Sequence, residues 1–167
     1  ILELARDQKI PLVALNVPRE IISQTSQLGW KNVEHATKTQ IGDPAPANNL
    51  YRKLLTNVFG QHEGSDEKSI DHFIEAQLVW DRSFAQGLLD AKMKTTRLVI
   101  GIIGSGNLQY GYGVTHQVSA SGDYKTVTFI PTNMGAACSS LDLLDEEGEP
   151  SADALFVAYQ NHEGNDK

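Results

Sequence analysis

One apolar run constrains the fold of this chain more than any other feature. Residues 98–103 read Leu-Val-Ile-Gly-Ile-Ile, without a polar side chain, and Gly104 follows directly. Short β-branched runs that lack alternating polar residues are typical of strands covered on both faces, at the centre of a parallel sheet. The run therefore predicts a central strand of an α/β domain.

The loop after this predicted strand is the strongest candidate for a binding site. It holds two tyrosines, Tyr110 and Tyr112, among four glycines: Gly104, Gly106, Gly111 and Gly113. In open parallel α/β sheets, ligands bind outside the carboxyl ends of the strands. The loop lies where such a ligand is expected. Alternatively, its glycines serve only to let the chain turn tightly before the next helix.

The rest of the chain alternates between helical and strand patterns. Further strands are predicted for three short apolar segments, residues 12–15, 125–130 and 154–159. Helical periodicity and end signals predict five helices, at residues 1–9, 18–28, 30–40, 50–58 and 66–93. This order predicts one α/β domain over residues 1–167, with a mostly parallel sheet flanked by helices. Residues 30–65 have no strand pattern, so we expect a small helical subdomain inserted there.

Composition excludes several classes of protein. The net charge of −7, without a basic cluster, argues against nucleic-acid binding. With Cys138 as the one cysteine, neither an internal disulfide nor a cysteine-based metal site is expected, and the five histidines show no zinc-binding spacing. The chain opens at Ile1 inside a helical pattern and without methionine, so we expect the natural polypeptide to start earlier.

The long helix predicted over residues 66–93 carries two polar residues inside its apolar stripe. Gln77 and Asp81 follow Ile74 at helical spacing. Buried polar groups need hydrogen-bond partners, because leaving them unpaired costs free energy. We expect both side chains to face the glycine-rich loop and to shape the site. Alternatively, Asp81 pairs locally with Arg19 or Arg82 and only orders the fold.

Tyrosine oxygens are possible iron ligands, because they bind ferric iron in some haem proteins. Tyr110 and Tyr112 lie in the loop, and Tyr51 lies in the predicted helical subdomain. Arg52 and Lys53 stand next to Tyr51 and are suited to pair with carboxylates such as haem propionates. Alternatively, the tyrosine rings only pack over the strand ends.

Three separate segments resemble the ChaN-like family of iron-regulated, haem-binding bacterial lipoproteins. They are ALNVPRE at residues 14–20, FIEAQLVWDRSFA at residues 73–85 and GSGNLQYGYGV at residues 104–114. The resemblance implies a large parallel sheet with a smaller helical subdomain, and haem held at the interface of a homodimer. It also implies a tyrosine as iron ligand, with a histidine and a lysine from the other subunit reaching the propionates. The implied location is the bacterial periplasm or outer membrane, with a lipid anchor outside this chain.

The resemblance makes a haem-binding protein of bacterial iron uptake, without catalytic activity, the leading hypothesis. The family usually has a histidine at Asn107 and a proline at Thr115, and its Gly-Glu-x-His motif is absent here. A hydrolase related to the wider fold group is one alternative, and a degenerate domain that binds a partner is another. The residues nominated for haem binding are Tyr51, His72, Gln77, Asp81, Gly104, Asn107, Tyr110 and Tyr112. The nominated iron ligands are Tyr51, Tyr110 and Tyr112.

Overall fold

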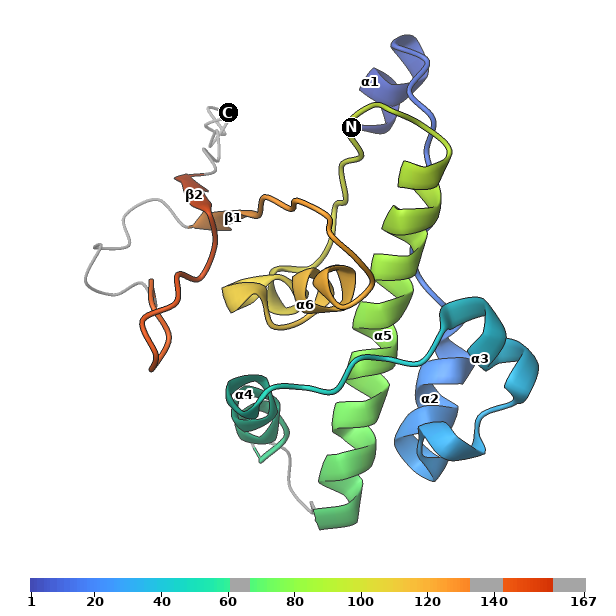
Figure 1. Ribbon diagram of the computed structural model, residues 1–167, viewed down its shortest axis with the longest axis vertical. Coiled ribbons are helices and arrows are strands. Elements are labelled where there is room, and N and C mark those ends of the chain that lie inside the picture. Colours follow the sequence, from blue (N-terminus) through green and yellow to red (C-terminus); the bar gives the residue numbers. More distant parts are fainter. Residues whose placement is uncertain (61–66, 133–142, 158–167) are drawn as a thin grey trace, which may run out of the picture.

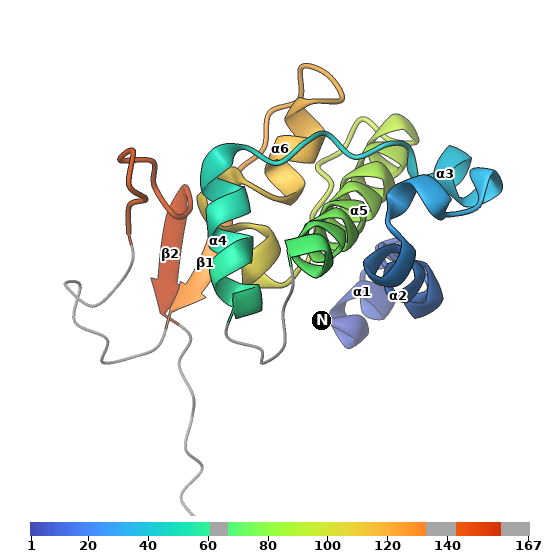
Figure 2. The same ribbon diagram turned by 90° about the horizontal axis from the view of Figure 1, so that it is seen from below.

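One long helix, α5 (Glu67–Met93), organises the fold of the computed structural model, which describes residues 1–60, 67–132 and 143–157. Its 27 residues make a rod about 40 Å long. Figures 1 and 2 show α2 (Arg19–Leu28) and α3 (His35–Ile41) on one side of the rod. On its other side lie α4 (Asn49–Gly60) and α6 (Val114–Ser119). The prediction of a long helix is confirmed.

The amino-terminal part is helical, as predicted, with one break. The helix α1 (Leu2–Asp7) comes first, and Pro18 lies just before α2. The helix predicted over residues 30–40 is split into the short 3-10 helix η1 (Trp30–Asn32) and α3, because Val33 adopts an extended backbone conformation with ψ 145°. Residues 30–60 contain helices and no strand, which agrees with the predicted helical subdomain over its described part.

Two of the predicted strands, at residues 12–15 and 98–103, are wrong. Both segments lack regular secondary structure, although both lie against α5. The Ser83 hydroxyl of α5 donates to the Leu15 carbonyl at 3.1 Å, and a Cβ on Gly101 would lie 3.0 Å from the Leu88 side chain. A strand forms only when another backbone pairs with it. Neither segment has such a partner among the described residues, so each covers the helix singly.

The run at residues 98–103 is consequently exposed on its outer side. Leu98, Ile100 and Ile102 have exposed fractions of 84%, 76% and 69%. Every second side chain of an extended segment points the same way, and here this outward set is uncovered. Exposed apolar rows of this kind mark surfaces that associate with other protein.

The sheet of the described residues has two strands, β1 (Phe129–Thr132) and β2 (Ala154–Val157). They run parallel, with Phe129 opposite Ala154 and Thr132 opposite Val157. The predicted strand at residues 125–130 begins later than expected, and residues 158–159 of the last predicted strand lie outside the described residues. Helices combined with a small parallel sheet are compatible with the α/β class, but the described residues do not form the large, mostly parallel sheet.

Two apolar clusters hold the helices together around α5. The first joins α4, α5 and the glycine-rich loop through Tyr51, Leu55, Ile74, Leu78 and Tyr112. The second joins the carboxyl half of α5 to α6, and its buried members are Ala85, Leu89, Val114 and Val118. The glycine-rich loop is thereby held in place where the two clusters meet along α5.

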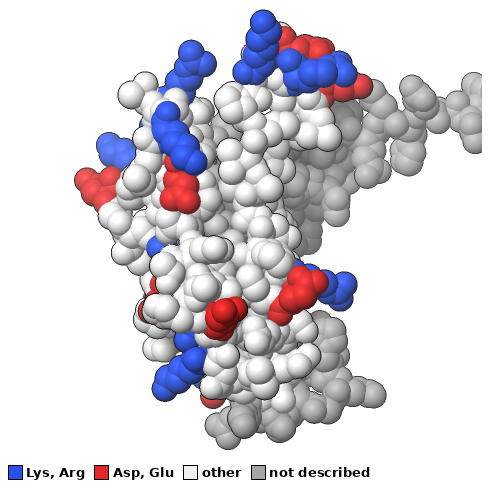
Figure 3. All heavy atoms as spheres, turned by 90° about the vertical axis from the view of Figure 1, so that its right-hand side faces the viewer, with Lys and Arg blue, Asp and Glu red and all other residues white. Residues whose placement is uncertain are grey.

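Charged side chains are distributed over the outside of this core. Figure 3 shows one face, on which acidic and basic side chains stand in small groups among wide uncharged areas. Within the described part of the chain, no helix combines the length and apolar character needed to cross a membrane.

Candidate functional site

A buried carboxylate lies at the centre of the candidate site. Helix α5 places Asp81 at a position with 0% exposure, facing α4 and the glycine-rich loop. Its Oδ2 accepts a hydrogen bond of 2.7 Å from the Tyr51 hydroxyl, and its Oδ1 accepts one of 2.7 Å from the Asn107 amide. Asp81 thus joins the helical subdomain to the loop, as expected from the sequence. The alternative of a local pair with Arg82 does not hold, because that guanidinium donates to Ser121 and Gln86.

The surroundings of Asp81 change its acidity. Burial raises the pKa of Asp81 to about 6, and hydrogen bonds from Asn107, Tyr51 and Gln77 offset part of this effect. Burial also raises the pKa of the Tyr51 hydroxyl, and the negative charge of Asp81 adds to that rise. Tyr51 therefore remains a phenol that donates to Asp81. Gln77 bonds to the same pair, so the two polar residues of the apolar stripe do act together.

Gly113 allows the loop to close over the carboxylate. A Cβ at this position would lie 2.4 Å from the Asn107 carbonyl oxygen and 3.0 Å from Asp81 Oδ1. Real Cβ atoms do not approach other atoms so closely, so any side chain here would push the loop away from α5. This close contact explains why position 113 is glycine, whereas the sequence alone does not distinguish Gly113 from the other glycines of the loop. By contrast, a Cβ on Gly106 would meet nothing within 4 Å.

The three nominated tyrosines lie together above this carboxylate. The rings of Tyr51 and Tyr112 have centroids 5.9 Å apart, and those of Tyr110 and Tyr112 are 5.3 Å apart. Tyr110 has a positive φ of 55°, which is uncommon for a residue other than glycine and costs on the order of 1 kcal/mol. Its backbone N–H donates to the Ser151 carbonyl at 2.9 Å, which helps to hold this conformation.

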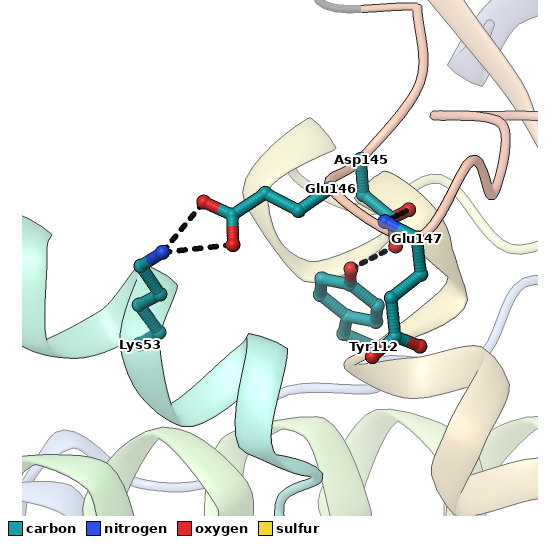
Figure 4. A network of polar contacts seen from close by, with 5 residues as sticks. All are labelled: Lys53, Tyr112, Asp145, Glu146 and Glu147. Atoms are coloured by element: carbon teal, nitrogen blue, oxygen red, sulfur yellow. Dashed lines mark hydrogen bonds and ion pairs between the residues drawn. The ribbon is translucent and has the colours of Figure 1, made fainter.

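A turn at residues 145–149, here called the acidic turn, covers the outer end of Tyr112 (Figure 4). The Tyr112 hydroxyl donates to Asp145 Oδ2. Asp145 Oδ1 accepts the backbone N–H groups of Glu147 and Glu149, each at 2.8 Å, which closes the turn on itself. Lys53 of α4 forms an ion pair with Glu146 at 2.6 Å.

Tyr112 is buried, with 6% exposure, whereas Asp145, which accepts its hydrogen bond, is half-buried. Burial and the hydrogen bond to Asp145 raise the pKa of Tyr112. The same hydrogen bond lowers the pKa of Asp145, and the backbone N–H groups of the turn add to that effect. Sequence reasoning missed this contact. The alternation of acidic residues with Gly148 in Asp-Glu-Glu-Gly-Glu is a turn signal, but it does not say what the turn touches.

The remaining nominated residues fall at different distances from the tyrosines. Gly104 is exposed at the start of the loop, where a Cβ would lie 3.4 Å from Asn107 Oδ1. His72 lies on another face of α5, since a Cβ on Gly29 would come within 3.0 Å of its Nε2. The structure therefore brings Tyr51, Gln77, Asp81, Asn107, Tyr110 and Tyr112 together and leaves His72 apart.

The donor set fits a haem in its chemistry. Phenol oxygens are ferric iron ligands, and Lys53 is a cation on the same surface as the Tyr112 hydroxyl (Figure 4). Among residues 1–60, 67–132 and 143–157, no cluster of three or more His, Cys, Asp or Glu side chains could hold a bare metal ion. The site thus offers individual tyrosine oxygen donors and the Lys53 cation.

The fold and the site together define a helix-rich protein, compatible with the α/β class, in which a buried carboxylate supports a tyrosine-bearing loop. Residues 1–118 match the family described as "Haem-binding uptake, Tiki superfamily, ChaN". The chain belongs to this family, which confirms the resemblance seen in the sequence. The match ends at the carboxyl side of the loop, so the acidic turn and both strands lie outside it. No curated protein and no solved structure matched the chain.

Proposed function

We propose that this chain is a haem-binding protein of bacterial iron uptake that holds haem between the glycine-rich loop and α4. The observation that carries the proposal is the family match over residues 1–118, which includes the whole loop and the carboxylate beneath it. When bound, haem would supply a ferric iron that accepts an oxygen ligand and propionates that pair with cations. At this site, the loop tyrosines offer an oxygen ligand for the iron, and Lys53 offers a cation for a propionate.

Within the tyrosine cluster, the loop supplies the better ligands. Tyr51 is 1% exposed and donates its hydroxyl to Asp81, so it would have to break a buried hydrogen bond to reach iron. The Tyr112 hydroxyl donates instead to the half-buried Asp145 of the acidic turn, and Tyr110 is half-buried next to it. We therefore assign the iron ligand to Tyr110 or Tyr112. Asp81, Gln77 and Asn107 act as positioning residues that hold the loop in place, and Gly104 is the residue at which the loop begins.

The proposal extends to a homodimer with haem at its interface. The exposed apolar row of Leu98, Ile100 and Ile102 supports association with a second protein surface. Because His72 faces away from the tyrosines of its own chain, it would reach a haem only from a second subunit. A periplasmic or outer-membrane location, through a lipid anchor outside this chain, is part of the same proposal and rests on the family resemblance.

We also propose that the protein is not an enzyme. Asn107 stands where the family usually has a histidine, and its side-chain amide donates a hydrogen bond of 2.7 Å to Asp81. An amide neither gives nor takes a proton near neutral pH, so it is not a general base. Hydrolysis would therefore need a different base than the one this position supplies in relatives.

The test is a titration of the purified chain with hemin, followed by its Soret band and by size-exclusion chromatography. The expected result is a saturable spectral shift, tyrosinate charge-transfer bands and a doubling of apparent size. Replacing Tyr110, Tyr112 and Tyr51 by Phe, singly and together, assigns the ligand, with far-UV circular dichroism as the folding control. An unchanged spectrum in the triple variant would disprove tyrosine ligation. A monomer that shows no shift would favour a domain that binds a protein partner instead.

A further inference from the structure

The acidic turn occupies one of the two oxygens that the proposed function offers to the iron. Asp145 accepts a hydrogen bond from the Tyr112 hydroxyl. Two open hollows of the described residues, of about 620 and 380 Å³, are lined by other side chains and by no tyrosine. In this conformation the outer end of Tyr112 is therefore capped by the turn rather than open to a pocket.

Separate contacts hold the turn in this place. The Lys53 ammonium donates to both carboxylate oxygens of Glu146, at 2.6 and 2.8 Å, and thereby connects the turn to α4. The Ser151 carbonyl accepts the Tyr110 N–H at 2.9 Å, and the Ser151 N–H donates to Leu143 at 2.8 Å. The Leu143–Ser151 bond closes the segment on itself, and the bonds of Ser151 and Glu146 attach it to the loop and to α4. The same Lys53 is the cation we assign to a propionate, so its ion pair is also taken.

We propose that the acidic turn is a latch that competes with haem for the Tyr112 oxygen and for Lys53. This inference rests on the proposed function and names how that site is regulated. For binding, Asp145 would have to leave Tyr112, whose oxygen would then be available to ferric iron, with the hydroxyl proton passing to solvent. Lys53 would exchange Glu146 for a propionate.

The hydrogen bond from Tyr112 to Asp145 and the ion pair between Lys53 and Glu146 would both have to break before either side chain could meet a ligand. A latch of this kind would set haem affinity below what the tyrosine alone could reach, and would let the protein release haem again.

The sharpest test is Asp145→Asn, which keeps an oxygen for the Glu147 and Glu149 N–H groups and removes the charge that holds Tyr112. We expect hemin to bind roughly ten- to a hundredfold more tightly, as befits the loss of a charge-assisted hydrogen bond. The matched control is Glu149→Gln, which removes the same charge from the same turn while its backbone N–H still donates to Asp145. We expect its affinity to stay within about twofold of the wild type.

A double variant shows where any gain arises. Asp145→Asn combined with Tyr112→Phe should bind hemin no more tightly than Tyr112→Phe alone, because the freed oxygen is absent. A gain that persists in the double variant would overturn the latch. So would wild-type affinity in Asp145→Asn while both proteins show tyrosinate bands, a result that leaves the proposed function standing. If hemin binds to neither protein, the proposed function falls and the latch with it. If it binds only to Asp145→Asn, both are supported.

Discussion

Two tyrosine–aspartate pairs of the same chemistry lie side by side in this molecule, with the Tyr51 and Tyr112 ring centroids 5.9 Å apart, but in different environments. Tyr51 and Asp81 form their hydrogen bond in the core, where both side chains are almost fully buried. Tyr112 and Asp145 form theirs further out, where Tyr112 is buried and Asp145 is half-buried in a turn. Burial raises the pKa of Asp81 to about 6, whereas the bond from Tyr112 lowers that of Asp145. The comparison teaches that the same contact is a permanent brace when both partners are buried and a more easily released one when the acceptor belongs to a half-buried turn.

The largest expected effect comes from removing the buried acceptor. Asp81→Ala leaves the Tyr51 hydroxyl and the Asn107 amide without their common partner in the core. We expect the free energy of unfolding to fall by about 3 kcal/mol, measured by urea denaturation. The control is Asp90→Ala, an exposed position of the same helix, with an expected change within about 0.5 kcal/mol. A loss below about 0.5 kcal/mol at Asp81 would show that this carboxylate does not brace the fold.

The second prediction uses pH to set the two aspartates against each other. The folded-state pKa of Asp81, about 6, lies above its ordinary value of 3.8, so its protonated form is favoured by folding. Its contribution is fully present below pH 4 and is lost as the pH rises to about 6, by roughly 2–3 kcal/mol. Asp145 has the opposite sign, because its lowered pKa gives a contribution that is lost as the pH falls below 4.

Unfolding free energies between pH 3 and pH 7 check this prediction when wild type is compared with Asp81→Asn and Asp145→Asn. The first variant should lose the decline between pH 4 and pH 6, and the second should keep it. If Asp81→Asn has the same pH profile as the wild type, the carboxylate titrates normally and the burial argument is wrong.

The third prediction concerns the close approach of the loop to α5. Gly113→Ala should lower the unfolding free energy by about 1–3 kcal/mol, because its Cβ would collide with the Asn107 carbonyl. Gly106→Ala in the same loop is the matched control, since a Cβ there meets nothing within 4 Å. Equal effects of the two substitutions would mean that backbone flexibility, not contact, explains the glycines.

The smallest effect is expected at the tyrosine hydroxyls themselves. Tyr51→Phe removes a donor from the buried Asp81, and we expect a loss of about 1–2 kcal/mol by urea denaturation. Tyr112→Phe removes a donor from a half-buried carboxylate that keeps its bonds from the Glu147 and Glu149 N–H groups, so its loss should be clearly smaller. A larger loss for Tyr112→Phe would reverse the comparison and make the outer pair the structural one.

Several parts of the site were predictable from local patterns. The spacing of Gln77 and Asp81 within an apolar stripe indicated buried polar groups that need partners, and both are found bonded beneath the loop. The tyrosines nominated at positions 51, 110 and 112 do form one cluster. These predictions held because helix periodicity places side chains on a face before any tertiary contact is known.

Other parts depended on contacts between distant segments. The run at residues 98–103 has the composition of a central strand, yet it is exposed because no described backbone pairs with it. The acidic turn is recognisable as a turn, but its position over Tyr112 joins residues 33 apart, and its ion pair with Lys53 spans 93. Contacts between residues so far apart in the chain cannot be recognised from local sequence patterns.

The amino-acid sequence by itself determined the long helix, the apolar face on which Asp81 lies, the helical character of residues 30–60 and the family. These follow from side-chain spacing and local backbone preference, which need no knowledge of neighbours. Only the tertiary structure decided which tyrosine is braced in the core and which is capped by the acidic turn. That choice depends on desolvation, and desolvation is a property of the packed surroundings rather than of any one residue.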